Sequence, residues 1–219
     1  MKILVTGGKG QLGCEINKLS SKNNYDWLFS DIDILDLSDL NSINVFLDKT
    51  SPDIIINCAA YTAVDNAEVD FENANTTNHK SVELIAIWSN NNNCKLIHIS
   101  TDYVYDGSSL IAVKEDTQAN PVNNYGKSKL LGDIACQKYN PSSIIIRTSW
   151  LYSSFGNNFV TKMINLMLHN DEIKVVNDQF GSPTFAADLA EVILQIINTN
   201  IWKPGIYHYT NLGKVSWFD

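Results

Sequence analysis

Tyr125 and Lys129, in the stretch "NPVNNYGKSKLLGD", have the residue types and the spacing for acid catalysis. Side chains four residues apart share one face of a helix, so the phenol and the ammonium would lie side by side. A phenol has a pKa near ~10, and a nearby ammonium makes it a better proton donor to a carbonyl oxygen that is becoming an alkoxide. The same spacing also fits two unrelated neighbours on a helix surface, so the rest of the chain must decide.

Thr101 is a second candidate, in the stretch "HISTDYVYDG". It falls at the carboxyl end of a predicted strand, the edge where doubly wound sheets bind their ligands. A hydroxyl group there can hydrogen-bond a substrate carbonyl beside the tyrosine. The alternative is a threonine that simply caps the end of the strand.

The glycine-rich stretch "TGGKGQLG" places Gly7, Gly10 and Gly13 between a predicted strand and a predicted helix. Glycine lets the backbone approach a pyrophosphate, and the helix N-terminus offers free N–H groups and the positive end of its dipole. The spacing is one residue longer than the usual G-x-G-x-x-G motif, and short glycine motifs also arise by chance. The strand–turn–helix setting favours a dinucleotide site.

Asp31 lies about 20 residues beyond this turn, where such sites carry an acid for a ribose hydroxyl. It favours NADH and would repel a 2′-phosphate, but Lys9 could offset that repulsion, so we expect both dinucleotides to be used. The alternative for Asp31 is an ordinary loop residue. Asp36 could contact adenine or cap the helix that follows it, and the sequence leaves both open.

The elements that must position these residues alternate regularly along the chain. Apolar runs predict strands over residues 2–6, 25–31, 53–60, 94–101 and 142–150, and periodic patterns predict helices over 11–20, 39–51, 75–92 and 125–139. This alternation predicts an α/β fold with a parallel sheet covered by helices on both faces. We assign residues 1–150 to this dinucleotide-binding domain.

Beyond Trp150 the alternation of predicted strands and helices becomes less regular. Helices are expected over 159–169 and 186–200, and short strands over 173–178 and 205–210. Because no Pro/Gly/Ser-rich linker intervenes, we assign residues 151–219 to part of a small substrate lobe interleaved with the first domain. Ser216 and Asp219, in "GKVSWFD", fit a helix N-cap and its capping-box partner, which predicts a helix beginning at Trp217 and Phe218.

Composition narrows the class of protein. The 219 residues are 44% hydrophobic, enough for one domain with a sizeable core. A net charge of −8 argues against a general nucleic-acid surface. The four cysteines are scattered and are interpreted as reduced. No apolar run has the length of a membrane span or a signal peptide, so we expect a cytoplasmic protein.

Taken together and in order, the glycine turn, Thr101 and the Tyr125–Lys129 pair resemble the extended short-chain dehydrogenase/reductases. Further stretches resemble the dTDP-4-dehydrorhamnose reductase family within that group, namely "NCAAYTAVDNAE", "STDYVYDG", "IIRTSWLY", "GNNF" and "VNDQFGSPT". The resemblance implies a Rossmann-type doubly wound sheet, NADPH or NADH as cofactor, and reduction of the 4-keto group of dTDP-4-dehydro-L-rhamnose to dTDP-L-rhamnose. It also makes a homodimer possible.

The resemblance assigns a role to each matching position. Catalysis falls to Thr101, Tyr125 and Lys129, with Thr101, Asp102 and Trp150 at the sugar. Trp150 could equally be a core residue beneath the lobe. The remaining assignments are to the cofactor: Gly7, Gly10, Gln11, Leu12, Asp31, Asp36, Leu37, Ala60, Tyr61 and Thr62, together with Tyr125 and Lys129.

Two departures from the family pattern matter. Glu15 matches one position of a metal site described in some members, but Ala187 stands at another, so we predict no metal. The family's C-terminal segment with an arginine–proline motif is absent, and Arg147 is expected to be a buried ion-pair partner instead. We therefore expect the chain to bind NAD(P)H but to turn over the dTDP-sugar poorly, with Trp217 and Phe218 left uncovered.

Three other functions stay open at this point. A nucleotide-sugar epimerase or dehydratase would share the fold and the Tyr–Lys pair, but it keeps NAD⁺ bound and returns the hydride. A regulatory subunit would bind dinucleotide without turnover. A generic dinucleotide-binding module would bind NAD(P)H but not dTDP.

Overall fold

The computed structural model describes residues 1–109, 111–199 and 201–219. Its centre is a six-stranded sheet in the order β2-β1-β3-β4-β5-β9, and every neighbouring pair is parallel. The strands are β1 Lys2–Thr6, β2 Asp26–Ser30, β3 Ile54–Asn57, β4 Lys95–Thr101, β5 Ile144–Thr148 and β9 Gly205–His208. The predicted doubly wound α/β fold is confirmed.

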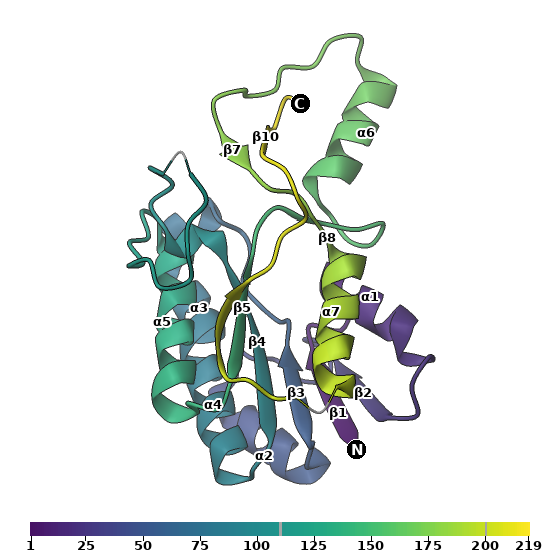
Figure 1. The fold of residues 1–219 in the computed structure, drawn as a ribbon, viewed down its shortest axis with the longest axis vertical. Helices are drawn as coiled ribbons and strands as arrows, with labels where there is room; N and C mark the ends of the chain where they lie inside the picture. The colour runs from purple at the N-terminus through teal and green to yellow at the C-terminus, as the bar shows by residue number, and fades with distance from the viewer. Residues whose placement is uncertain (110, 200) are drawn as a thin grey trace.

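Helices cover both faces of the sheet (Figure 1). On one face lie α1 (Gln11–Ser20) and α7 (Ala186–Asn198), which contact each other. On the other lie α2 (Leu40–Thr50), α4 (Ser81–Asn91) and α5 (Asn124–Tyr139). Alternate strand residues feed the two cores, with Ile3 facing α1 and α7 and Leu4 facing α2 and α4. Burial on both faces explains the unbroken apolar runs of these strands.

Side-chain caps fix where the helices begin. Asp39 caps α2 by accepting from the Asn41 N–H at 3.1 Å. Asn123 caps α5 by accepting from the Gly126 N–H at 2.7 Å, so α5 starts just before Tyr125. Asp36 is therefore not the cap of α2; its carboxylate accepts from the backbone and side chain of Ser38 instead.

The helix predicted over residues 75–92 begins earlier and changes its winding. It starts as α3 (Phe71–Asn75), loosens into a π-helical turn over Thr76–Lys80, and continues as α4. Such turns insert a residue into the helical ladder and frequently occur at functional sites. Here the turn aims a buried side chain, Asn78, at the end of β3.

Beyond β5 the chain builds a smaller upper lobe, in which α6 (Phe159–His169), β7 (Phe180–Gly181) and β10 (Val215–Ser216) stand above the sheet (Figure 1). A short parallel pair, β6 (Leu151–Tyr152) and β8 (Thr184–Phe185), lies at its base. The chain also returns to the main body, because α7 covers the sheet and β9 extends it. Residues 151–219 thus contribute to both parts.

Two predictions about this region were wrong and one was confirmed. No strand forms over residues 173–178; β10 pairs instead with the later segment Phe180–Gly181. The predicted strand over residues 205–210 is confirmed as β9, which joins the central sheet. No helix begins at Trp217, although Ser216 and Asp219 make the predicted capping hydrogen bonds, including Ser216 N to Asp219 Oδ2 at 2.7 Å. Residue 200, at the end of the predicted helix 186–200, lies outside the described residues.

None of the helices in the described ranges combines the length and the apolar character required to cross a bilayer.

Candidate active site

A cleft of about 1260 Å³ opens between the carboxyl ends of the sheet strands and the upper lobe. It lies over β1 and β3, where the strand order reverses, which is the usual ligand position in doubly wound sheets. The structure brings every predicted site residue to this one cleft: Gly7, Gly10, Gln11, Leu12, Asp31, Asp36, Leu37, Ala60, Tyr61, Thr62, Thr101, Asp102, Tyr125, Lys129 and Trp150.

The glycine turn has the close packing that a dinucleotide cradle requires. Gly7 has φ +65°, and a Cβ atom there would lie 2.8 Å from the Ala59 backbone. A Cβ at Gly13 would lie 2.7 Å from the Gly8 Cα and would collide with the Gly7 carbonyl. Helix α1 begins beside this turn without a side-chain cap, so its first N–H groups are available to a pyrophosphate.

Asp31 follows β2 and already orders the turn opposite the glycines. One carboxylate oxygen accepts from the Lys9 N–H at 2.8 Å and the other accepts from the Ile32 N–H at 2.9 Å. The Lys9 ammonium pairs with the exposed Asp33 carboxylate at 2.8 Å. An incoming 2′-phosphate would have to draw Lys9 away from Asp33, and this exposed ion pair contributes little stability.

The segment after β3, which carries Ala60, Tyr61 and Thr62, forms one wall of the cleft. Asn78 of the π-helical turn holds it from behind: its Oδ1 accepts from the Tyr61 N–H at 2.9 Å and its Nδ2 donates to the Tyr61 carbonyl at 3.0 Å. The same Nδ2 donates to Ser128 Oγ at 2.9 Å, which ties this wall to α5. Sequence reasoning missed Asn78, because a π-helical turn leaves no clear mark in the apolar periodicity.

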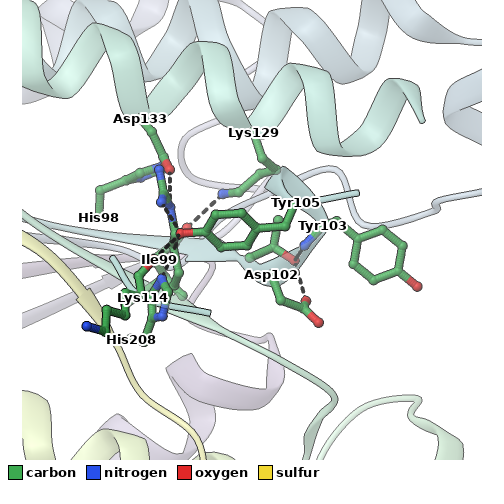
Figure 2. A network of polar contacts seen from close by, with 11 residues as sticks. His98, Ile99, Asp102, Tyr103, Tyr105, Lys114, Lys129, Asp133 and His208 are labelled. Carbon is green, nitrogen blue, oxygen red and sulfur yellow. Dashed lines mark hydrogen bonds and ion pairs between the residues drawn. The ribbon is translucent and has the colours of Figure 1, made fainter. Parts of the chain in front are cut away.

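Tyr125 and Lys129 lie on the buried face of α5, not on an exposed surface. The Lys129 ammonium donates to the Ile99 carbonyl of β4 at 2.7 Å (Figure 2). Thr101 ends β4 beside Tyr125; its hydroxyl donates to Asp102 Oδ1 at 3.1 Å and accepts from the Tyr103 N–H at 3.2 Å. The geometry therefore supports a catalytic set over a surface pair.

Burial dominates the protonation of this set. It raises the pKa of the Tyr125 phenol well above its ordinary value, and the Thr101 side chain lowers it only in part. The expected lowering of the Tyr125 pKa by Lys129 does not prevail in the unliganded cleft, because burial is the largest influence on the phenol. Burial also lowers the pKa of Lys129 to about 8 and raises that of Asp102 to about 6. The unliganded cleft thus holds a protonated phenol, which is the form a general acid needs.

Trp150 lines the cleft from the lobe side in a strained backbone conformation, φ +46°. Such conformations in a bulky residue persist where the surrounding structure enforces them, commonly at functional sites. Its ring stacks on Trp217 with centroids 3.6 Å apart, and Phe159 packs on Trp217 at 4.3 Å. Gly181 makes room, because a Cβ there would lie 2.5 Å from the Trp150 ring.

This aromatic cluster corrects the expected exposure of Trp217. Its ring is covered by Trp150 and Phe159, because β10 brings the residue across to the lobe; Phe218 does remain exposed. Trp217 and Phe159 also line the cleft. Little in the sequence points to this cluster, since the contact joins positions far apart along the chain.

The predicted role of Arg147 is confirmed, because its Nε donates to the fully buried Asp133 at 2.9 Å. Glu15 is buried and accepts from Ser153 Oγ at 2.6 Å. Within residues 1–109, 111–199 and 201–219, no group of three His, Cys, Asp or Glu side chains could hold a metal ion.

A doubly wound sheet, a glycine turn at its switch point and a Thr–Tyr–Lys set at one cleft are the features of the extended short-chain dehydrogenase/reductases. The family described as "RmlD substrate binding domain" matches residues 1–219, and the chain belongs to this family.

Relatives of known name agree with this assignment. The chain is 40% identical to a dTDP-4-dehydrorhamnose reductase of Aggregatibacter actinomycetemcomitans, over all of this chain and 76% of the relative. A dTDP-4-dehydrorhamnose reductase structure from Clostridium acetobutylicum aligns with TM-score 0.95 and 41% identity, over 100% of this chain and 77% of that one. One from Bacillus anthracis, in complex with NADP, has TM-score 0.95 and 38% identity over 99% and 77% of the two chains.

Proposed function

We propose that this protein reduces the 4-keto group of dTDP-4-dehydro-L-rhamnose to give dTDP-L-rhamnose, with NADPH or NADH as the hydride donor. The observation that carries the proposal is the position of Tyr125, Thr101 and Lys129 in the same cleft as the glycine turn. The names of the relatives, including one solved with NADP, supply the substrate class.

The residues present fit a dinucleotide. The turn at Gly7 and Gly13 has no space for side chains, which is what a close approach to a pyrophosphate requires. The free N-terminus of α1 would hold the pyrophosphate, and Asp31 would hold the adenosine ribose. When bound, the cofactor supplies the hydride that is added to the C4 carbonyl carbon of the sugar.

Side chains of the protein would then protonate and stabilise the C4 oxygen as its negative charge develops. Tyr125 would donate its phenolic proton to the C4 oxygen as that oxygen becomes an alkoxide, and the Thr101 hydroxyl would hold the carbonyl in place. The charged Lys129 would stabilise the tyrosinate that remains until it regains a proton from solvent. Asp102 would accept from a sugar hydroxyl, and Trp150 would offer an apolar face to the ring.

The test follows NADPH absorbance in the purified protein. Oxidation should require a dTDP-4-keto-6-deoxyhexose and should be stoichiometric with product. Tyr125→Phe should lower turnover ~10²–10⁴-fold. Its affinity for NADPH should stay within about threefold, or ~0.7 kcal/mol, of the wild-type value. Near-normal turnover in this variant would remove Tyr125 from the mechanism.

The same assay separates the competing functions. Conversion of the sugar without net NADPH oxidation would indicate an epimerase or dehydratase. Binding of NADPH with no conversion of any sugar would fit a regulatory subunit and would also fit the poor turnover expected from the sequence. The expected homodimer and cytoplasmic location stay predictions.

A further inference from the structure

Asp133 lies one helical turn beyond Lys129 on α5, and Tyr125 lies one turn before it. The spacing of four residues puts all three on the face of α5 that packs against the sheet. Asp133 is fully buried and Lys129 is 2% exposed. Figure 2 shows both side chains reaching down from the same helix toward β4. The proposed mechanism gives Asp133 no role so far.

A cation from the sheet stabilises the Asp133 carboxylate: burial raises the pKa of Asp133, and Arg147 opposes that rise. Arg147 of β5 donates from Nε to Asp133 Oδ2 at 2.9 Å, and its NH1 donates to Tyr105 Oη at 2.7 Å. Tyr105 Oη also lies 2.9 Å from His208 Nε2 of β9 (Figure 2). Arg147 is therefore fixed by β5, by Tyr105 and by the carboxylate itself, and it cannot turn toward Lys129 without breaking these bonds.

His98 of β4 faces the other oxygen of Asp133, Oδ1, at 3.9 Å from Nε2. Its Nδ1 lies 3.1 Å from Asn57 Nδ2, and Asn57 Oδ1 already accepts from Thr6 Oγ1 at 2.6 Å. Asn57 must therefore donate to Nδ1, so a neutral imidazole carries its proton on Nε2, toward Asp133. Burial, followed by the nearby Lys129, lowers the pKa of His98 well below its ordinary value, so the ring is neutral.

Titratable side chains from three parts of the fold bear on the charge of Lys129. Asp133 and Cys136 face it from α5, Cys58 from the segment after β3, and the neutral His98 from β4. Burial raises the pKa of both thiols, Cys58 to about 12, so neither is an anion at neutral pH. Asp133 is the carboxylate of this group.

We propose that Asp133 is a positioning residue for the reduction, which holds Lys129 in its charged form beside Tyr125, with Arg147 keeping the Asp133 carboxylate in place. This inference rests on the proposed function for its catalytic meaning. A buried ammonium loses its proton readily, because desolvation disfavours the charged form. An anion at the next turn of the same helix offsets that loss at the position where the phenol needs a cation.

The direct test is titration of Lys129 by NMR, in protein labelled with ¹³C at the lysine Cε positions and assigned with Lys129→Arg. The wild-type midpoint should fall near the Lys129 pKa of about 8. In Asp133→Asn it should move about one pH unit or more lower, the usual effect of losing a close opposite charge. Exposed Lys138 at the end of α5 should not move and serves as the internal control.

Two variants separate this role from a structural one. Asp133→Asn/Arg147→Gln removes the anion together with its arginine partner, so no buried guanidinium is left unpaired, and it should fold even if the single variant does not. It should show the same downward shift. His98→Gln alters an equally buried partner of Asp133 without altering the charge, so it should leave the midpoint unchanged. An unchanged midpoint in the double variant, whatever its stability, overturns the proposal.

Turnover provides an independent reading. A one-unit shift in Lys129 should lower the rate of Asp133→Asn about fivefold at pH 8, with the alkaline limb of the pH profile moved to lower pH. Inactive wild-type protein would refute the proposed reduction but would leave the NMR titration valid. A shifted midpoint with an unshifted pH profile would refute the catalytic role of Asp133.

Discussion

Replacing Lys129 with methionine should stabilise the protein while abolishing the proposed activity. Lys129 is 2% exposed, and burial lowers its pKa from 10.5 to about 8. Each pKa unit corresponds to ~1.36 kcal/mol, so keeping this lysine charged at neutral pH costs the folded state about 3 kcal/mol. Methionine has similar length and no charge. It loses the hydrogen bond to the Ile99 carbonyl, worth ~1 kcal/mol, so the expected net gain is about 2 kcal/mol.

The stability difference between Lys129→Met and the wild type should depend on pH in a definite direction. The unfolded chain holds the Lys129 proton up to its ordinary pKa of 10.5, whereas the folded chain releases it near 8. Between these values the unfolded wild-type protein binds more protons, so wild-type stability rises with pH relative to Lys129→Met. The advantage of the variant should be constant below about pH 8 and should disappear as pH approaches 10.5.

Urea unfolding of both proteins, at neutral pH and near pH 10, measures this difference. All other titrating groups are common to the two proteins, so their contributions cancel in the comparison to first order. The cofactor must be left out, because ligand binding would add its own stabilisation to the wild type. A variant that is less stable than the wild type at neutral pH, or a difference that does not change with pH, would refute the argument that Lys129 is a desolvated cation.

Three further changes test other parts of the cleft. Asp31→Ala should shift preference toward NADPH by removing repulsion of the 2′-phosphate, and an unchanged NADPH/NADH affinity ratio in titrations would count against Asp31 as the ribose contact. Gly13→Ala places a Cβ 2.7 Å from the Gly8 Cα, so it should cost about 1–3 kcal/mol in urea unfolding and weaken NADPH binding in calorimetry. Gly181→Ala pushes on the Trp150 ring, so it should raise KM for the sugar nucleotide; an equal loss of NADPH affinity would contradict this assignment.

The sequence predicted those parts of the site that depend on local backbone geometry and on the order of the elements. The glycine turn works through backbone conformation, and Gly7 does adopt φ +65°. The helix repeat alone predicts that Tyr125 and Lys129 are neighbours. The place of Asp31 at the site is predicted by its position after the second strand. Parallel strands place their carboxyl ends at one edge, so the order of motifs was enough to bring these residues to one cleft.

The tertiary structure decided what depends on partners far away in the chain. Asp133 meets Arg147, Asn78 holds the wall at Tyr61, and Trp217 covers Trp150, through contacts that no local pattern encodes.

The protonation states of the site residues were also decided by the tertiary structure. The sequence suggested that Lys129 would lower the pKa of Tyr125, but burial raises it, because desolvation depends on everything packed around the phenol. Spacing along one helix determined which groups are neighbours. The surrounding fold alone determined how much water they lose, and with it the charge they carry.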